Sequence, residues 1–224
     1  MKTQTISSRS QLGFSLIELM IAMTLTLIVA GAAATLLSQS FRMRNREDIR
    51  SDAIADAQRA LNIVSREIAN SGFGLIDNGI VPGDSNNGSI RVRANLNAYT
   101  LEPLNREVSD PDEDIKYLMY NDDAQNRHYL VRLDAVVAKT DRAKATTVLA
   151  NRLDSFNLQY YDGNGALLNV AANPLAVANA WKVRITVGVN LPADGKFGSP
   201  GYQPASTIQL VSDVVLRNTV QTTF

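Results

Sequence analysis

The chain has 224 residues, with 22 Lys and Arg, 22 Asp and Glu, and no Cys. Its hydrophobic content of 45% and charged content of 20% are ordinary for a globular protein and argue against disorder along the whole chain. The balanced charge gives no general reason to bind nucleic acid, and the lack of Cys excludes disulfides and thiolate metal sites. The single histidine, His128, disfavours His-based metal sites and hydrolase triads.

Residues 14–37 form an apolar run in which Glu18 is the single charged residue. As a helix, the run rises about 36 Å, which is enough to cross a hydrocarbon core of roughly 30 Å. A buried core helix seldom stays apolar on every face over this length. The apolar region of a secretory signal peptide is shorter, about 7–15 residues, although the small residues at 30–34 resemble the end of one. The run therefore favours a transmembrane helix.

Residues 38–71 continue without Pro or Gly and carry an apolar stripe at helical spacing. The stripe consists of Ile49, Ala53, Ala57, Leu61, Val64 and Ile68. Gly72 and Gly74 then supply a helix stop. The sequence predicts one continuous helix over 14–71, apolar on all faces in its first half and amphipathic in its second.

A Gly-, Asn- and Pro-rich loop at 72–88 precedes a region with the alternation of β-strands. Strands are predicted at 89–96, 115–120, 128–137, 146–150, 153–161, 182–191 and 207–217. Residues 162–165 (DGNG) predict a hairpin turn. We expect an α+β fold in which the helical stripe covers one face of an antiparallel sheet.

The N-terminal segment carries a recognisable signal. Residues 13–18 read GFSLIE and follow a short polar leader that contains Lys2 and Arg9. The Gly–Phe junction, the Glu that follows it and the adjoining apolar run resemble the type III signal of type IV prepilins and pseudopilins. In that superfamily a membrane aspartyl peptidase cleaves after the Gly and methylates the new amine. The resemblance implies processing between Gly13 and Phe14 and a role in assembly for Glu18.

The same resemblance implies how the chain is organised and what it contacts. It implies a pilin-like protein with a cleaved leader (1–13), a transmembrane half-helix (14–37), an amphipathic half of the same helix (38–71) and a periplasmic β-rich globular domain (72–224). The implied partners are prepilin peptidase, other minor pilins and a major pilin or pseudopilins, and an inner-membrane assembly platform.

Three later segments are similar to the group of the minor pilin PilW and the type II secretion pseudopilin J. They are an I-x-Y pattern at 115–118 with L-x-R at 129–132, a VLA stretch from 148 through 163, and a terminal strand ending at 214–218. This implies a minor pilin of a type IV pilus, without enzymatic activity or cofactor, that serves in filament initiation or at the tip. The alternatives are a minor pseudopilin of a type II secretion system, and a membrane-anchored periplasmic binding protein or enzyme. For an enzyme, the sequence offers at most carboxylate chemistry.

The charges that flank the apolar run conflict with the signal. Lys2 and Arg9 precede it, whereas Arg42, Arg44, Arg46 and Arg50 follow it, so a count of basic residues places the second flank in the cytoplasm. The signal resembles one that is read on the cytoplasmic side, and we give it precedence. We therefore expect a cytoplasmic N-terminus and a periplasmic C-terminal domain, and later a place in a pilus or pseudopilus. The Arg cluster then pairs with anionic lipid headgroups or with acidic side chains of neighbouring subunits, or it is a solvated helix face with salt bridges of its own.

Two acidic segments are candidates for Ca²⁺. Residues 84–88 (DSNNG) resemble a calcium loop, but the Gly and Glu positions do not fit, so a flexible turn is expected. The second segment contains Asp110, Asp112, Glu113 and Asp114, with Asp122 and Asp123 nearby if the following strands pair there. We expect an exposed acidic loop and predict no metal site, while calcium binding at 110–114 stays open. His128 is expected to be a surface or strand residue, and the strand tyrosines at 117, 120, 160 and 161 to serve in packing.

Overall fold

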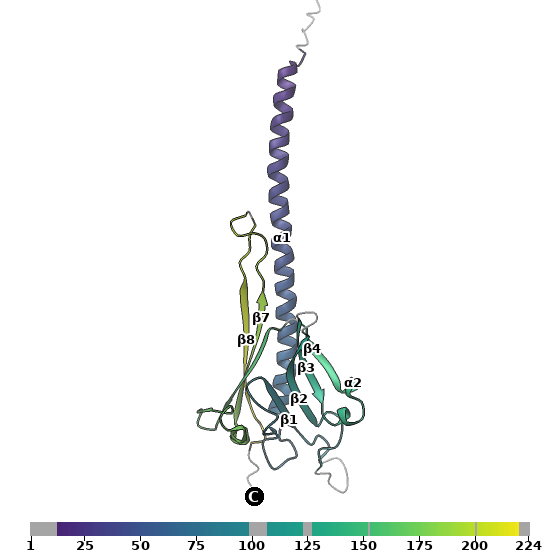
Figure 1. Cartoon of the computed structure of the whole chain (residues 1–224), viewed down its shortest axis with the longest axis vertical. Coiled ribbons are helices and arrows are strands. Elements are labelled where there is room, and N and C mark those ends of the chain that lie inside the picture. Colours follow the sequence, from purple (N-terminus) through teal and green to yellow (C-terminus); the bar gives the residue numbers. More distant parts are fainter. Residues whose placement is uncertain (1–12, 99–106, 123–126, 152, 200, 220–224) are drawn as a thin grey trace, which may run out of the picture.

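Helix α1 (Leu16–Ala69) is the longest element of the computed structural model, which describes residues 13–98, 107–122, 127–151, 153–199 and 201–219. Its 54 residues form one uninterrupted helix that leads into the β-rich part of the molecule (Figure 1). The predicted continuous helix is confirmed, with each end two residues inside the expected bounds. The helix ends at Ala69 with Asn70 as its C-cap residue, and Gly72 follows with a φ of 76°. A Cβ on Gly72 would lie 2.5 Å from the Asp77 carbonyl oxygen, so this stop requires glycine.

The two halves of α1 have different surroundings. Residues 16–38 are exposed on every face, whereas one face of the second half is buried. The buried residues are Ala53, Ala57, Ala60, Leu61, Val64 and Ile68. Five of them belong to the predicted stripe. Ile49, the first residue of that stripe, is 39% exposed because the helix meets the core one turn later.

The strands divide between two four-stranded antiparallel sheets instead of the single sheet expected. The first sheet has the order β1-β2-β3-β4 and consists of β1 (Ser89–Arg93), β2 (Asp114–Asp122), β3 (Arg127–Asp134) and β4 (Thr146–Ala150). The second has the order β6-β5-β7-β8 and consists of β5 (Ser155–Tyr161), β6 (Leu167–Leu168), β7 (Lys182–Leu191) and β8 (Ser206–Val215). Short helical turns lie at Val137–Lys139, Arg142–Ala145 and Pro174–Asn179. The α+β class is confirmed.

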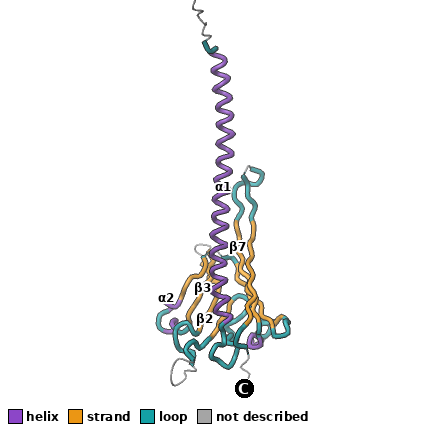
Figure 2. Tube along the Cα trace, turned by 180° about the vertical axis from the view of Figure 1, so that it is seen from behind, coloured by secondary structure: helices purple, strands orange, loops and turns teal. Residues whose placement is uncertain are grey.

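Both sheets direct side chains onto the second half of α1, which lies between them in Figure 2. Val183, Ile185, Val187 and Val189 of β7 are all buried, as their alternation predicts. β4, β7 and β8 contact the helix directly. The sheets also meet each other, since β5 contacts β1 and β2, and the Leu158 amide of β5 donates to the carbonyl of Asn87, in the turn before β1, at 2.8 Å. The core is therefore a single one, built around the buried face of α1.

A polar joint fastens the end of α1 to the first sheet. Tyr117 and Arg132 are cross-strand partners on β2 and β3, and both donate to the Glu67 carboxylate of α1. The Arg132 Nε lies 3.1 Å from Oε2 of Glu67, and its Nη2 lies 2.7 Å from Oδ1 of Asp112. Burial of the phenol, together with the negative charge of Glu67, raises the pKa of Tyr117. The hydroxyl thus remains a proton donor to the helix.

Candidate processing and assembly site

Gly13 and Phe14 lie just before α1, and both are exposed. Phe14 is 82% exposed, and Ser15 has the extended backbone of an N-cap residue, with φ −72° and ψ 141°. Among the described residues, and apart from its chain neighbours, none has an atom within 4 Å of the position that a Cβ on Gly13 would occupy. The predicted processing residues therefore occupy an accessible, non-helical segment in which a peptidase can reach the backbone.

Glu18 is the third residue of α1 and lies in its first turn, where its carboxylate is exposed. The backbone N–H groups of a first turn lack intrahelical partners, and the helix dipole favours a negative charge there. Glu18 makes no ion pair with any residue that the structure describes. Phe14 is four positions earlier in the chain, just before the helix, so an amine created at Phe14 would lie next to the turn that holds Glu18. The carboxylate is placed to accept from a cation at this level, on its own chain or on a neighbour.

The exposed half of α1 offers an apolar surface on which Glu18 is the single charged residue. It is long and apolar enough to cross a membrane, and its most apolar stretch is not buried by the rest of the protein. The hydroxyls of Thr24, Thr26 and Thr35 donate to the carbonyls of Ile21, Ala22 and Ala32 in the preceding turn, at 2.7–2.9 Å. A helix that satisfies its own hydroxyls in this way is suited to lipid or to other apolar helices.

Comparison with known protein families bears on these same residues. The family described as the prokaryotic N-terminal methylation motif matches residues 8–34. The chain carries this methylation motif. The match includes Gly13, Phe14 and Glu18 and continues into the apolar run, and it indicates a type IV pilin-like or pseudopilin-like substrate of prepilin peptidase. Such a substrate has assembly partners and is anchored by its N-terminal helix. No curated protein matches the chain.

The acidic segment at 110–114 differs from the exposed loop expected for it. Glu113 and Asp114 are buried, with 1% and 6% of their surface exposed. The Glu113 carboxylate accepts backbone N–H groups from Leu96 at 2.9 Å and from Ser109 and Asp110 at 3.1 Å, and so closes the loop onto the end of β1. The expectation was wrong for these two residues because their carboxylates find donors inside the fold.

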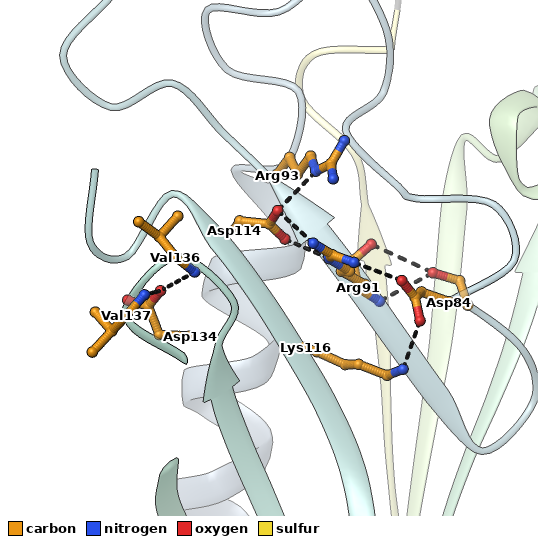
Figure 3. A network of polar contacts seen from close by, with 9 residues as sticks. Asp84, Arg91, Arg93, Asp114, Lys116, Asp134, Val136 and Val137 are labelled. Atoms are coloured by element: carbon orange, nitrogen blue, oxygen red, sulfur yellow. Dashed lines mark hydrogen bonds and ion pairs between the residues drawn. The ribbon is translucent and has the colours of Figure 1, made fainter. Parts of the chain in front are cut away.

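Asp114 and Asp84 belong to a network with three basic side chains (Figure 3). Arg91 lies between them, 2.6 Å from each carboxylate, while Arg93 reaches Asp114 at 3.0 Å and Lys116 reaches Asp84 at 2.7 Å. Burial opposes the charged form of Asp114, but the hydrogen bonds and charges of Arg91 and Arg93 together outweigh it and hold the pKa below its usual range. Hydrogen bonds from Lys116 and Arg91 likewise lower the pKa of Asp84. The turn at 84–88 is thus tied to β1 and β2 by ion pairs.

The grouping of acidic residues suggested by the sequence does not form. Asp114 begins β2 and Asp122 ends it, so about 26 Å of strand separates them. Asp123 lies outside the described residues. Among the residues that the structure describes, no three acidic or His side chains converge in a way that could hold a metal ion. The Nδ1 of His128 lies 2.9 Å from the Asn121 Oδ1 on the neighbouring strand.

Sequence reasoning missed the polar contacts of α1 with residues far along the chain, of which two recur below. One is the joint at Glu67, and the other joins Arg46 to backbone carbonyls of the β7–β8 hairpin. The partners lie 65 and 146 residues away from their helix residues. The tyrosines divide: Tyr117 and Tyr160 are fully buried, whereas Tyr120 is 58% exposed and has its ring centroid 6.5 Å from that of Tyr129.

Proposed function

We propose that the protein is a minor pilin of a type IV pilus, a structural subunit that acts in filament initiation or tip assembly after processing by prepilin peptidase. The observation that carries the proposal is the division of α1 into an apolar half with no cover and a half that forms the core of the β-rich part. With the methylation motif at its start, this helix suits a subunit that leaves the membrane to join a bundle of similar helices.

The joint at Glu67 supports the narrower resemblance to the PilW and pseudopilin J group. Tyr117 supplies the Tyr of the I-x-Y pattern and Arg132 the Arg of the L-x-R pattern, and the two converge on one carboxylate of α1. The pattern therefore has a physical reason beyond strand alternation, because it fastens the helix to the first sheet. The absence of Cys and the length of 224 residues count against a major pilin that closes its C-terminal loop by a disulfide.

In the proposed sequence of events, the leader lies in the cytoplasm and the C-terminal domain in the periplasm. Prepilin peptidase cleaves between Gly13 and Phe14 and methylates the amine of Phe14, and the assembly platform then lifts α1 into the bundle. Moving from lipid to other apolar helices exchanges one apolar surrounding for another, so hydrophobicity supplies little net drive. Close packing at small residues such as Ala30 and Ala34, and polar pairing, then select the partner helices.

Glu18 is the residue that we propose for this polar pairing. A carboxylate near the centre of a transmembrane helix costs about 2.5–3.5 kcal/mol on insertion scales, and less near the interface. A pair with the amine of Phe14 in the adjacent subunit would remove this penalty only at one axial stagger, because an unmatched charge in an apolar bundle is disfavoured. Glu18 would thereby set the register between helices.

The experiment is the substitution Glu18→Val. We expect the variant to insert and to be cleaved, but to be lost from a detergent-extracted complex with its partner pilins and from sheared filaments. Glu47→Val is the matched control, since Glu47 is an exposed helix carboxylate beyond the apolar run and should be recovered normally. Recovery of Glu18→Val at the wild-type level would refute the inter-subunit role, except for a subunit at the extreme tip, which has no subunit ahead of it.

A minor pseudopilin of a type II secretion system shares every one of these features. Genomic neighbours separate the two functions: a retraction ATPase gene indicates a pilus, whereas a secretin with a full pseudopilin set indicates secretion. A membrane-anchored binding protein or enzyme is the third candidate, and it should neither require Glu18 nor co-purify with pilins.

A further inference from the structure

The β7–β8 hairpin extends along α1 away from the rest of the β-rich part, toward the exposed half of the helix (Figures 1 and 2). We call the residues between its strands, 192–199 and 201–205, the hairpin tip. The tip is held in a defined shape, because the amides of Asp194 and Gln203 each donate to the carbonyl of the other at 2.9 Å. Within it, the Tyr202 amide donates to the Ser199 carbonyl at 3.1 Å.

The tip is fastened to α1 at two levels. Arg46 donates to the carbonyls of Pro192 at 3.2 Å, of Gln203 at 3.3 Å, and of Pro204. Further up the helix, Gly201 packs so closely on Gln39 that an added Cβ would lie 3.3 Å from the Gln39 Cγ. The tip therefore lies along the helix from the level of Arg46 to the level of Gln39.

These levels place the tip relative to a bilayer. The apolar run ends at Leu37, and Gln39 follows after about 3 Å of helical rise, whereas Arg46 lies about 14 Å beyond Leu37. The interfacial layer on each side of a bilayer is roughly 5–8 Å thick, from the difference between total and hydrocarbon thickness. When α1 spans the membrane, the part of the tip beside Gln39 therefore lies within the headgroup layer.

The side chains of the tip suit that layer. Phe197 is 85% exposed, and its ring meets Tyr202 edge-on with centroids 5.4 Å apart. Lys196 is exposed beside it, and Arg42 and Arg44 are exposed on α1 at a similar level. Aromatic rings with an apolar body concentrate at membrane interfaces, and basic side chains there meet anionic lipid.

We propose that the hairpin tip is a second membrane contact, in which Phe197 inserts into the boundary between the headgroups and the acyl chains of the leaflet that faces the β-rich part. The contact lies beside the transmembrane helix and depends on it, but not on the identity of the filament. It holds the β-rich part against the membrane and limits its rotation about α1. Lifting α1 out of the bilayer then also withdraws the tip from the lipid.

The test measures the depth of a fluorescent label in the full chain, reconstituted in vesicles of phosphatidylethanolamine and phosphatidylglycerol. The chain has no Cys, so single substitutions give unique labels. Lys196→Cys reports on the tip and keeps Phe197. Leu37→Cys is the control for membrane insertion. Leu175→Cys is the control for the aqueous phase, because Leu175 is 69% exposed in the helical turn Pro174–Asn179, at the end of β7 opposite the hairpin tip. Quenching by nitroxide-labelled lipid is the readout.

We expect the label at 196 to be quenched several-fold more than the label at 175 and to approach the label at 37. Adding Phe197→Ser should reduce quenching at 196 toward the value at 175 and leave the label at 37 unchanged. Because Phe197 is exposed, its loss should not unfold the protein. The proposal is overturned if the label at 196 behaves like that at 175 while 37 is quenched. It is equally overturned if the label at 196 is shielded from water but insensitive to quencher lipid, which would indicate a protein neighbour.

Discussion

Removing α1 from the β-rich part should unfold it, and the size of the effect follows from the buried face of the helix. Two fragments make the comparison. One begins at Ser40, which removes the apolar half and keeps the buried residues from Ala53 to Ile68. The other begins at Gly72, which removes the whole helix. The first fragment should be soluble and folded, and the second should aggregate or fail to fold.

The buried helix face supplies a free energy as large as the stability of a typical domain. Leu61, Val64 and Ile68 are each at most 7% exposed and contribute about 1.5–3 kcal/mol apiece, and the three buried alanines contribute about 0.8 kcal/mol each. The sum is about 7–11 kcal/mol, against a usual stability of about 5–15 kcal/mol for a whole domain. Loss of the helix also exposes the core-facing side chains of both sheets, which favours aggregation.

Size-exclusion chromatography, circular dichroism and urea unfolding of the two fragments are the measurements. The fragment from Ser40 should be monomeric and unfold in one cooperative transition. The fragment from Gly72 should elute as aggregate or lack a transition. If both fragments give the same transition midpoint, the stripe on α1 is not part of the core and the reasoning fails.

Two further predictions concern processing and the polar joint. Gly13→Val should block cleavage, so that mass spectrometry finds the full-length chain. Gly31→Val is the control, because the structure offers open space at both glycines, and this variant should still be processed. A cut at another position in the wild-type protein would contradict the site. Tyr117→Phe should lower the stability of the fragment from Ser40 by about 1.5–3 kcal/mol because it removes a hydrogen bond to a charged group. Glu67→Ala should cost about 1–3 kcal/mol because it leaves the buried Tyr117 hydroxyl without its acceptor, while Arg132 keeps Asp112 as a partner. An equal effect from the exposed control Glu47→Ala would argue against the joint.

The sequence predicted the elements well, because their signals are local. The apolar run and the stripe from Ala53 to Ile68 lie on a helix, and the alternation at 182–191 gives the observed bounds of β7. The bounds of strands that end in turns were predicted less well. The strand predicted at 89–96 ends at Arg93 in the structure, because pairing with β2 stops there. β6 has two residues, too few to show a period.

Contacts between distant segments could not be read in the same way. Alternation reports which face of a strand is buried but not which strands are neighbours, so two sheets were predicted as one. Nothing near Glu67 in the sequence indicates that Tyr117 and Arg132 will meet it. The burial of Glu113 depends on amides of three loop residues, which the composition of the acidic segment does not reveal. The processing residues could be proposed from the sequence because their signal is a contiguous motif, which requires no knowledge of the fold.

The polar contacts of α1 also determine how a displacement of the helix reaches the rest of the protein. Arg46 holds the β7–β8 hairpin near one end of the covered half, and Glu67 holds the first sheet near the other, about 32 Å further along the helix. Between them the small side chains of Ala53, Ala57 and Ala60 let both sheets approach the helix closely. A pull on α1 is therefore transmitted to the β-rich part at both ends and along the packed face between them. If Glu18 sets the axial offset between neighbouring helices, as proposed, the same offset also sets the axial position of the two sheets along the filament.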